Sequence, residues 1–226
     1  MVRSVHLTPR HKRFIEDVRA CLYNLDIMSH RPFYEDIRFL FMSHGEHCGI
    51  LSRAHREKTG PTLVSRASKY SMMVGVGFNM DAPNARSLWD AVFGNRVHFE
   101  AVYAGRQELS MGEVRALFDG MMNAQEATLR EMYDGCWDQL RANEHLAIED
   151  AFLEGGPCRV GAETGFYRHI RRYTTMGEPL YLNAALCTLL EDRKGKRHMR
   201  KRHLAETLLL EGIHGASTGE MSAYPL

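Results

Sequence analysis

Residues 111–154 have the sequence MGEVRALFDGMMNAQEATLREMYDGCWDQLRANEHLAIEDAFLE, the longest stretch of the chain with helical periodicity. Ser110 and Glu113 have the spacing of a capping box, which predicts the start of a helix. The pattern predicts one long helix, or two stacked helices with a break at Gly120 or Gly135, and we expect its carboxylates mostly on the solvated face. Apolar residues recur at three- and four-residue intervals: Val114, Leu117, Phe118, Met121, Met122, Leu129, Met132, Tyr133, Cys136, Trp137 and Leu140.

Helical patterns extend through most of the remaining sequence. Thr8 and Pro9 predict a helix start, a second helix opens near Ser29 and is expected to run as far as Lys58, and residues 166–173 predict a short basic helix. Residues 74–78 contain two glycines and indicate a loop or a short extended piece. The fold class predicted is all-α, an irregular multi-helix bundle of about seven to nine helices with at most one short extended segment.

One break divides the chain more clearly than any other, at Glu154-Gly155-Gly156-Pro157. It predicts a helical core over 1–156 that contains the acidic long helix, and a basic helical lobe over 157–212. Residues 213–226 are rich in glycine and serine and are expected to form a flexible tail.

The composition is that of an ordinary globular protein. The 226 residues are 44% hydrophobic and 25% charged, and no apolar run approaches the roughly 20 residues that span a bilayer. Residues 1–13 are basic but are not followed by the apolar stretch of a secretory signal. Five well-separated cysteines without a C-x-x-C pair favour reduced thiols over a disulfide framework. These features predict an intracellular protein without a membrane partner, cytoplasmic or nuclear, or contained in a virion.

Charge is distributed unevenly although the formal net charge is only +1. Residues 111–154 contain ten acidic residues and three arginines, a balance of −7, whereas residues 159–203 contain eleven basic and four acidic residues, a balance of +7. The two segments are expected either to neutralise each other within one molecule or to meet between copies. A head-to-tail contact of the second kind builds rings or filaments.

Basic residues concentrate in two clusters of the last third. Arginine predominates in them, and its planar guanidinium binds phosphate through two parallel hydrogen bonds. The first cluster combines Arg168, Arg171 and Arg172 with Tyr167 and Tyr173, and aromatic rings beside arginines suit phosphates and unstacked bases. The second cluster lies within residues 192–203 and contains seven cations: Arg193, Lys194, Lys196, Arg197, Arg200, Lys201 and Arg202.

These clusters predict a non-enzymatic protein that binds the phosphate backbone of nucleic acid, with DNA and RNA left open. The alternative is a structural or assembly subunit, such as a component of a viral or phage particle, that self-associates through its acidic and basic surfaces. An inert solvated surface is the third interpretation.

Other chemistry finds little support in the sequence. His44, His47, Cys48 and His55 would share one side of a helix, but a single helix seldom surrounds a metal and the spacing matches no established zinc module. No serine, cysteine or carboxylate has a diagnostic spacing from a histidine, and no phosphate loop is present. We therefore expect no metal, no cofactor and no catalytic residue.

Overall fold

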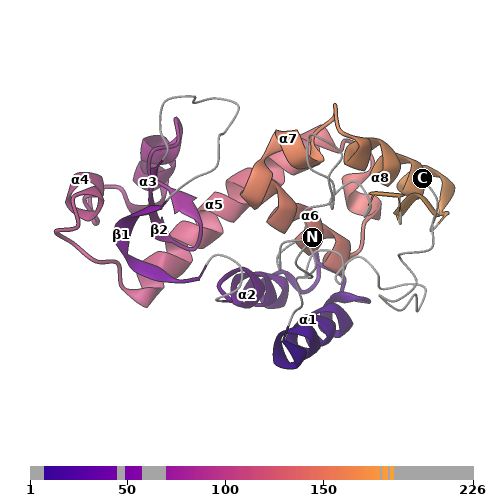
Figure 1. Cartoon of the computed structure of the whole chain (residues 1–226), viewed down its shortest axis with the longest axis horizontal. Helices are drawn as coiled ribbons and strands as arrows, with labels where there is room; N and C mark the ends of the chain where they lie inside the picture. The colour runs from indigo at the N-terminus through magenta and orange to yellow at the C-terminus, as the bar shows by residue number, and fades with distance from the viewer. Residues whose placement is uncertain (1–7, 45–48, 58–69, 179, 183, 186–226) are drawn as a thin grey trace, which may run out of the picture. The chain divides into compact units, whose positions relative to one another are not determined.

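The computed structural model describes residues 8–44, 49–57, 70–178, 180–182 and 184–185. Two compact units divide the chain, unit 1 with Met1–Ile37 and Ala127–Leu226, and unit 2 with Arg38–Glu126 (Figure 1). The elements in chain order are α1 Pro9–Leu22, α2 Arg31–Met42, β1 Leu51–Glu57, β2 Ser71–Gly75, β3 Phe78–Asn79, α3 Ala85–Phe93, α4 Phe99–Tyr103, α5 Met111–Met132, the 3-10 helix η1 Trp137–Gln139, α6 Ala142–Gly155, α7 Pro157–Val160 and α8 Gly165–Met176.

The protein is mostly helical, as predicted, but it is not all-α. The three strands form an antiparallel sheet in the order β1-β2-β3. The helix expected to run to Lys58 ends instead at Met42, and β1 follows it. Most side chains of β1 are exposed, so its sequence carries no alternating pattern. β1 exists through pairing with β2, for example His55 with Met73, and such a partner is not visible in local sequence.

Unit 2 packs its sheet beside α3, α4 and α5 (Figure 1). Trp89 of α3 is fully buried and donates its indole N–H to the carbonyl of Val97 at 2.8 Å. The rings of Phe93 and Phe99 contact Trp89 edge-on, with centroids 4.8 and 5.3 Å away. This aromatic cluster joins α3 to α4.

The long periodic stretch forms two α-helices, α5 and α6, with the 3-10 helix η1 between them, and the break falls near Gly135. The capping box is confirmed, since Ser110 N–H donates to Glu113 Oε2 at 2.7 Å and Glu113 N–H donates to Ser110 Oγ at 3.3 Å. Gly135 has φ +72°, a conformation that side chains disfavour. Gly120 remains helical inside α5, where it lets that helix approach Val92 of α3 closely.

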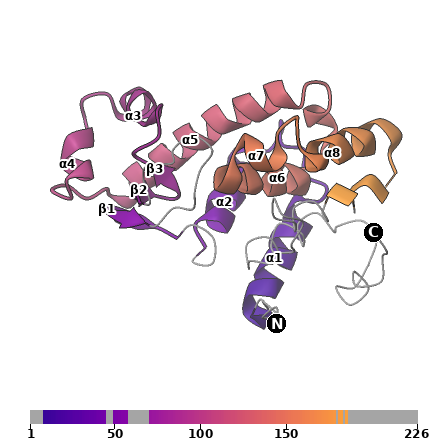
Figure 2. The ribbon, with the colours of Figure 1, turned by 45° about the horizontal axis from the view of Figure 1, so that its top comes forward.

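Helix α6 forms the centre of unit 1. It lies between α1 and α7 (Figures 1 and 2), and all ten residues from Ala142 to Ala151 are buried. For α6 this corrects the expectation of solvated carboxylates, because Glu144, Glu149 and Asp150 are each at most 1% exposed. Packing on every side of α6 leaves it no solvated face, so polar groups must be satisfied internally.

Buried carboxylates of α6 accept hydrogen bonds from other elements of unit 1. Tyr34 of α2 donates its hydroxyl to Glu149 Oε2 at 2.9 Å. Glu144 caps its own helix, since its Oε2 accepts from the Arg141 N–H at 2.8 Å. These bonds offset part of the cost of placing charge in the core.

The helices after Pro157 belong to the same compact unit as α1 and α6. The basic lobe over 157–212 and the tail over 213–226 stay predictions, because residues 186–226 lie outside the described part of the chain. Among the helices that the structure describes, none has the length and apolar character needed to cross a bilayer.

Candidate nucleic-acid interface

Five of the twelve predicted binding residues lie on one described element, α8. They are Tyr167, Arg168, Arg171, Arg172 and Tyr173. The other seven lie outside the described residues: Arg193, Lys194, Lys196, Arg197, Arg200, Lys201 and Arg202. The short basic helix predicted over 166–173 is confirmed and extends to Met176.

Local sequence explains why α8 forms and which side it exposes. Thr164 is its N-cap and accepts a hydrogen bond from the Tyr167 N–H at 3.1 Å. Phe166 and Ile170 are buried, whereas Arg168, Arg171 and Arg172 are exposed on the opposite side, at spacings of three and four residues. We call these three arginines the basic face of α8.

Each arginine of the basic face has an uncharged partner within unit 1. Arg168 donates from Nη1 to the Glu163 carbonyl at 3.3 Å. Arg171 donates from Nη1 to the Tyr167 hydroxyl at 3.1 Å and lies over that ring. The guanidinium of Arg172 lies over the ring of Tyr181, 5.8 Å from its centroid. These contacts orient the guanidinium groups without cancelling their charge.

Several other arginines of the described part pair with carboxylates. Arg130 pairs with Asp138, Arg159 with Glu154, and Arg115 with Asp119. Throughout the described ranges, no carboxylate forms an ion pair with an arginine of the basic face. The basic face therefore combines three exposed cations that the described fold does not neutralise.

His169 lies on α8 beside the basic face, and burial together with the charge of that face lowers its pKa. The pKa of His169 lies below its ordinary value of 6.5, mainly because the side chain is partly buried and further because Arg172 and Arg168 are positively charged. Its Nδ1 is buried and has no hydrogen-bond partner among the described residues. The imidazole is therefore neutral at neutral pH, in keeping with the positive potential of the neighbouring guanidinium groups.

The two tyrosines predicted to stack bases contact the protein core. The ring of Tyr167 lies 4.9 Å from that of the fully buried Tyr133. Tyr173 donates its hydroxyl to Glu144 Oε1 at 2.9 Å, and burial together with this carboxylate raises the pKa of Tyr173. Both tyrosines fix α8 to the core, and their contact with bases stays a prediction.

Sequence reasoning did not identify Tyr181, whose ring lies beside Arg172. Tyr181 lies beyond the end of α8, after Gly177 has turned the chain, so helical spacing does not relate it to the arginines. The only sign in the sequence that Tyr181 belongs to the site was its position a few residues after the arginine-rich helix.

The metal site considered for His44, His47, Cys48 and His55 does not form on one helix. His44 follows the end of α2 and His55 lies on β1, while His47 and Cys48 are outside the described residues. Within the ranges that the structure describes, no three His, Cys, Asp or Glu side chains are placed to hold a metal ion.

A scan against models of protein families and searches of curated proteins and of solved structures found no match for this chain.

Proposed function

We propose that the protein binds the phosphate backbone of nucleic acid through the basic face of α8, without a chemical step. The observation that carries this proposal is that Arg168, Arg171 and Arg172 are exposed together and have no carboxylate partner in the described part of the chain. The basic run from Arg193 to Arg202 adds seven further cations in the sequence.

Unneutralised guanidinium groups on one side of a helix repel one another, and phosphate relieves this repulsion. Binding also releases the counterions condensed on a nucleic acid, which makes the affinity depend steeply on salt. The uncharged partners of each arginine lower the entropy lost when a phosphate is bound, because the side chains are already oriented.

The alternative of assembly through complementary surfaces has less support, since seven of the ten carboxylates of residues 111–154 are buried or paired with an arginine of the same segment or its neighbourhood. Of the ten, four are buried, namely Glu126, Glu144, Glu149 and Asp150. Asp119, Asp138 and Glu154 pair with arginines. Little acidic surface is left in this segment to receive the basic face of a second copy.

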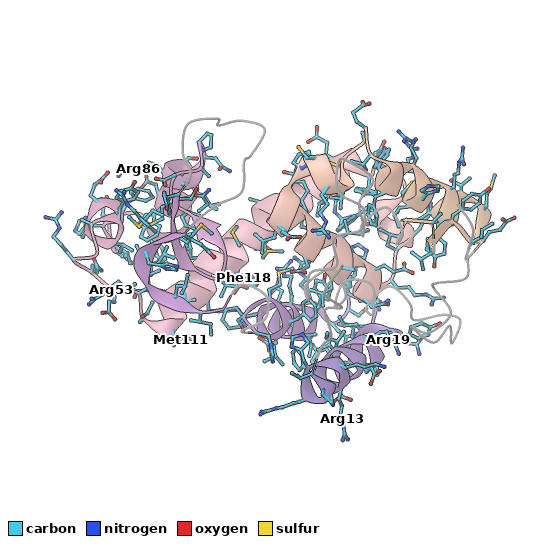
Figure 3. The ribbon with its side chains drawn as sticks, in the orientation of Figure 1. Arg13, Arg19, Arg53, Arg86, Met111 and Phe118 are labelled. Atoms are coloured by element: carbon cyan, nitrogen blue, oxygen red, sulfur yellow. The ribbon has the colours of Figure 1, made fainter. Side chains whose placement is uncertain are left out.

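Affinity for an oligonucleotide measured against salt concentration tests the proposal. The wild-type protein should show a steep log–log slope, and R168Q/R171Q/R172Q should reduce its magnitude by about 2 to 3, or roughly 0.7 to 0.9 for each lost phosphate contact. R10Q/R13Q/R106Q is the matched control, because it removes the same charge from exposed arginines elsewhere (Arg13 is labelled in Figure 3).

A flat slope for the wild-type protein would reject the proposal, as would an equal loss in the two triple variants. Light scattering at low and high salt adds a second criterion. An oligomer that is free of nucleic acid and dissociates with salt would favour the structural subunit instead.

A further inference from the structure

Apolar side chains are exposed where α8 ends. Met176 is 59% exposed and Leu180 is 64% exposed. Between them Gly177, with φ +69°, ends the helix in a left-handed conformation and turns the chain. The Tyr181 N–H then donates to the Glu178 carbonyl at 3.1 Å. We call Met176, Leu180 and Tyr181 the apolar platform.

Arg172 joins the apolar platform to the basic face of α8. It lies four residues before Met176, so both side chains are on the same side of the helix. Its guanidinium also lies over the ring of Tyr181. Leu182, which is 3% exposed, anchors the helical segment that carries Tyr181. A phosphate-binding group and an aromatic ring are therefore held side by side.

We infer that the apolar platform contacts unpaired bases, so that α8 takes single-stranded rather than double-stranded nucleic acid. This inference rests on the proposed function, because the arginines must hold the phosphates for bases to reach the platform. Every base has an apolar face, so such a contact tolerates any sequence.

The two forms of nucleic acid differ in what they offer to an apolar surface. In a duplex, the bases stack on one another and charged phosphates cover the outside. Contact with Met176 and Leu180 would then remove water from the phosphates without giving them a polar partner, which is unfavourable. In a single strand, a base can rotate onto Tyr181 while its phosphate stays on Arg172. A surface of arginines next to exposed apolar side chains matches the second ligand.

A second copy of the chain fits the apolar platform less well. A specific protein interface buries about 800 Å² on each partner, whereas the platform offers two exposed apolar side chains and one half-buried ring. Like charges of the basic face would also meet across such a symmetric contact.

Fluorescence anisotropy with the full-length protein tests the inference. The ligands are oligothymidylate and oligouridylate of about 12 nucleotides, and DNA and RNA duplexes of equal length at the same salt. We expect the wild-type protein to bind single strands roughly tenfold or more tightly than duplexes, and M176S/L180S to weaken single-strand binding about tenfold while duplex binding changes less than about twofold. Y181L should act in the same direction, since it keeps an apolar side chain and removes the ring.

M28S/M111S is the matched control, because these methionines are 81% and 55% exposed at other places. Equal binding of duplex and single strand by the wild-type protein, or equal losses with both ligands in M176S/L180S, would overturn the inference. A steep dependence of affinity on salt that is reduced in R168Q/R171Q/R172Q would in that case still support the proposed function.

If no ligand binds in a salt-dependent way, both proposals fail. Serine variants that change the mass measured by light scattering would assign the platform to a second copy and overturn the inference as well.

Discussion

The hydroxyl of Tyr173 on α8 donates a hydrogen bond of 2.9 Å to Oε1 of Glu144, a residue of α6 that is only 1% exposed. Glu144 uses its second oxygen to accept the backbone N–H of Arg141. One carboxylate therefore caps the N-terminus of α6 and also holds α8, the helix that carries the basic face.

Replacing Tyr173 with phenylalanine should destabilise the protein by about 1.5 kcal/mol, because a buried carboxylate loses a hydrogen-bond donor. Burial already raises the pKa of Glu144, and loss of the donor should raise it further. A carboxyl whose folded pKa lies above its unfolded value stabilises the fold at acidic pH and loses that contribution as pH rises through the folded pKa. The deficit of Y173F in urea denaturation should therefore grow from acidic to neutral pH. A deficit that does not change with pH would contradict this account.

Replacing Gly120 with alanine should destabilise unit 2 despite the better helix propensity of alanine. A Cβ at residue 120 would lie 2.4 Å from Cγ2 of Val92, which a packed core does not accommodate. We expect a loss of about 1–3 kcal/mol in thermal or chemical denaturation. The double variant G120A/V92A should lose less than the sum of its single changes.

Gly112 gives the control for this substitution on the same helix. An added Cβ there meets nothing within 4 Å, so G112A should stabilise the protein by up to about 1 kcal/mol. Equal effects of G112A and G120A would show that α5 does not pack against Val92 through Gly120.

The ion pair between Arg38 and Glu126 lies within unit 2, where the Arg38 side chain is 0% exposed and that of Glu126 is 10% exposed. R38M should cost about 3 kcal/mol, because it removes the guanidinium that compensates a buried carboxylate. R38M/E126L should recover much of this loss, since replacing both charges with apolar groups removes the desolvation cost. A double variant that is less stable than R38M would contradict the prediction.

The pKa of His169 should report occupancy of the basic face. In the free protein this pKa lies below 6.5, so at acidic pH the unfolded chain binds more protons than the folded protein. The free energy of unfolding therefore falls as the pH drops below about 7. Phosphates bound to Arg168 and Arg172 would offset their charge and raise this pKa, so binding should take up a proton.

An NMR titration of the imidazole Cε1–H with and without an oligonucleotide measures this shift, and H169Q assigns the resonance. An unchanged His169 pKa in a complex whose affinity depends on Arg168 and Arg172 would show that phosphate does not approach the histidine.

Most of the helical structure followed from local sequence. The cap at Thr8, the capping box at Ser110 and Glu113, and the basic helix near Arg168 are confirmed, because each depends on residues within one or two helical turns. Strand β1 and the early end of α2 at Met42 could not be predicted, because pairing across the sheet overrides weak local preferences.

The candidate site was likewise predictable only in part from the sequence. The sequence predicted a short basic helix that contains Arg168, Arg171 and Arg172, because their helical context is local. It could not show that Tyr173 reaches Glu144 or that Tyr181 lies beside Arg172, because those contacts join segments that only folding brings together.

The sequence by itself determined that α1, α5 and α8 form and where α1 and α5 begin, since these depend on backbone geometry and short-range hydrogen bonds. Only the tertiary structure decided that residues 142–151 of α6 are enclosed on all sides and that Glu144, Glu149 and Asp150 lie in the core rather than in water. The physical reason is that burial depends on the elements packed around a helix, and a periodic pattern cannot show whether its polar side meets solvent or another helix.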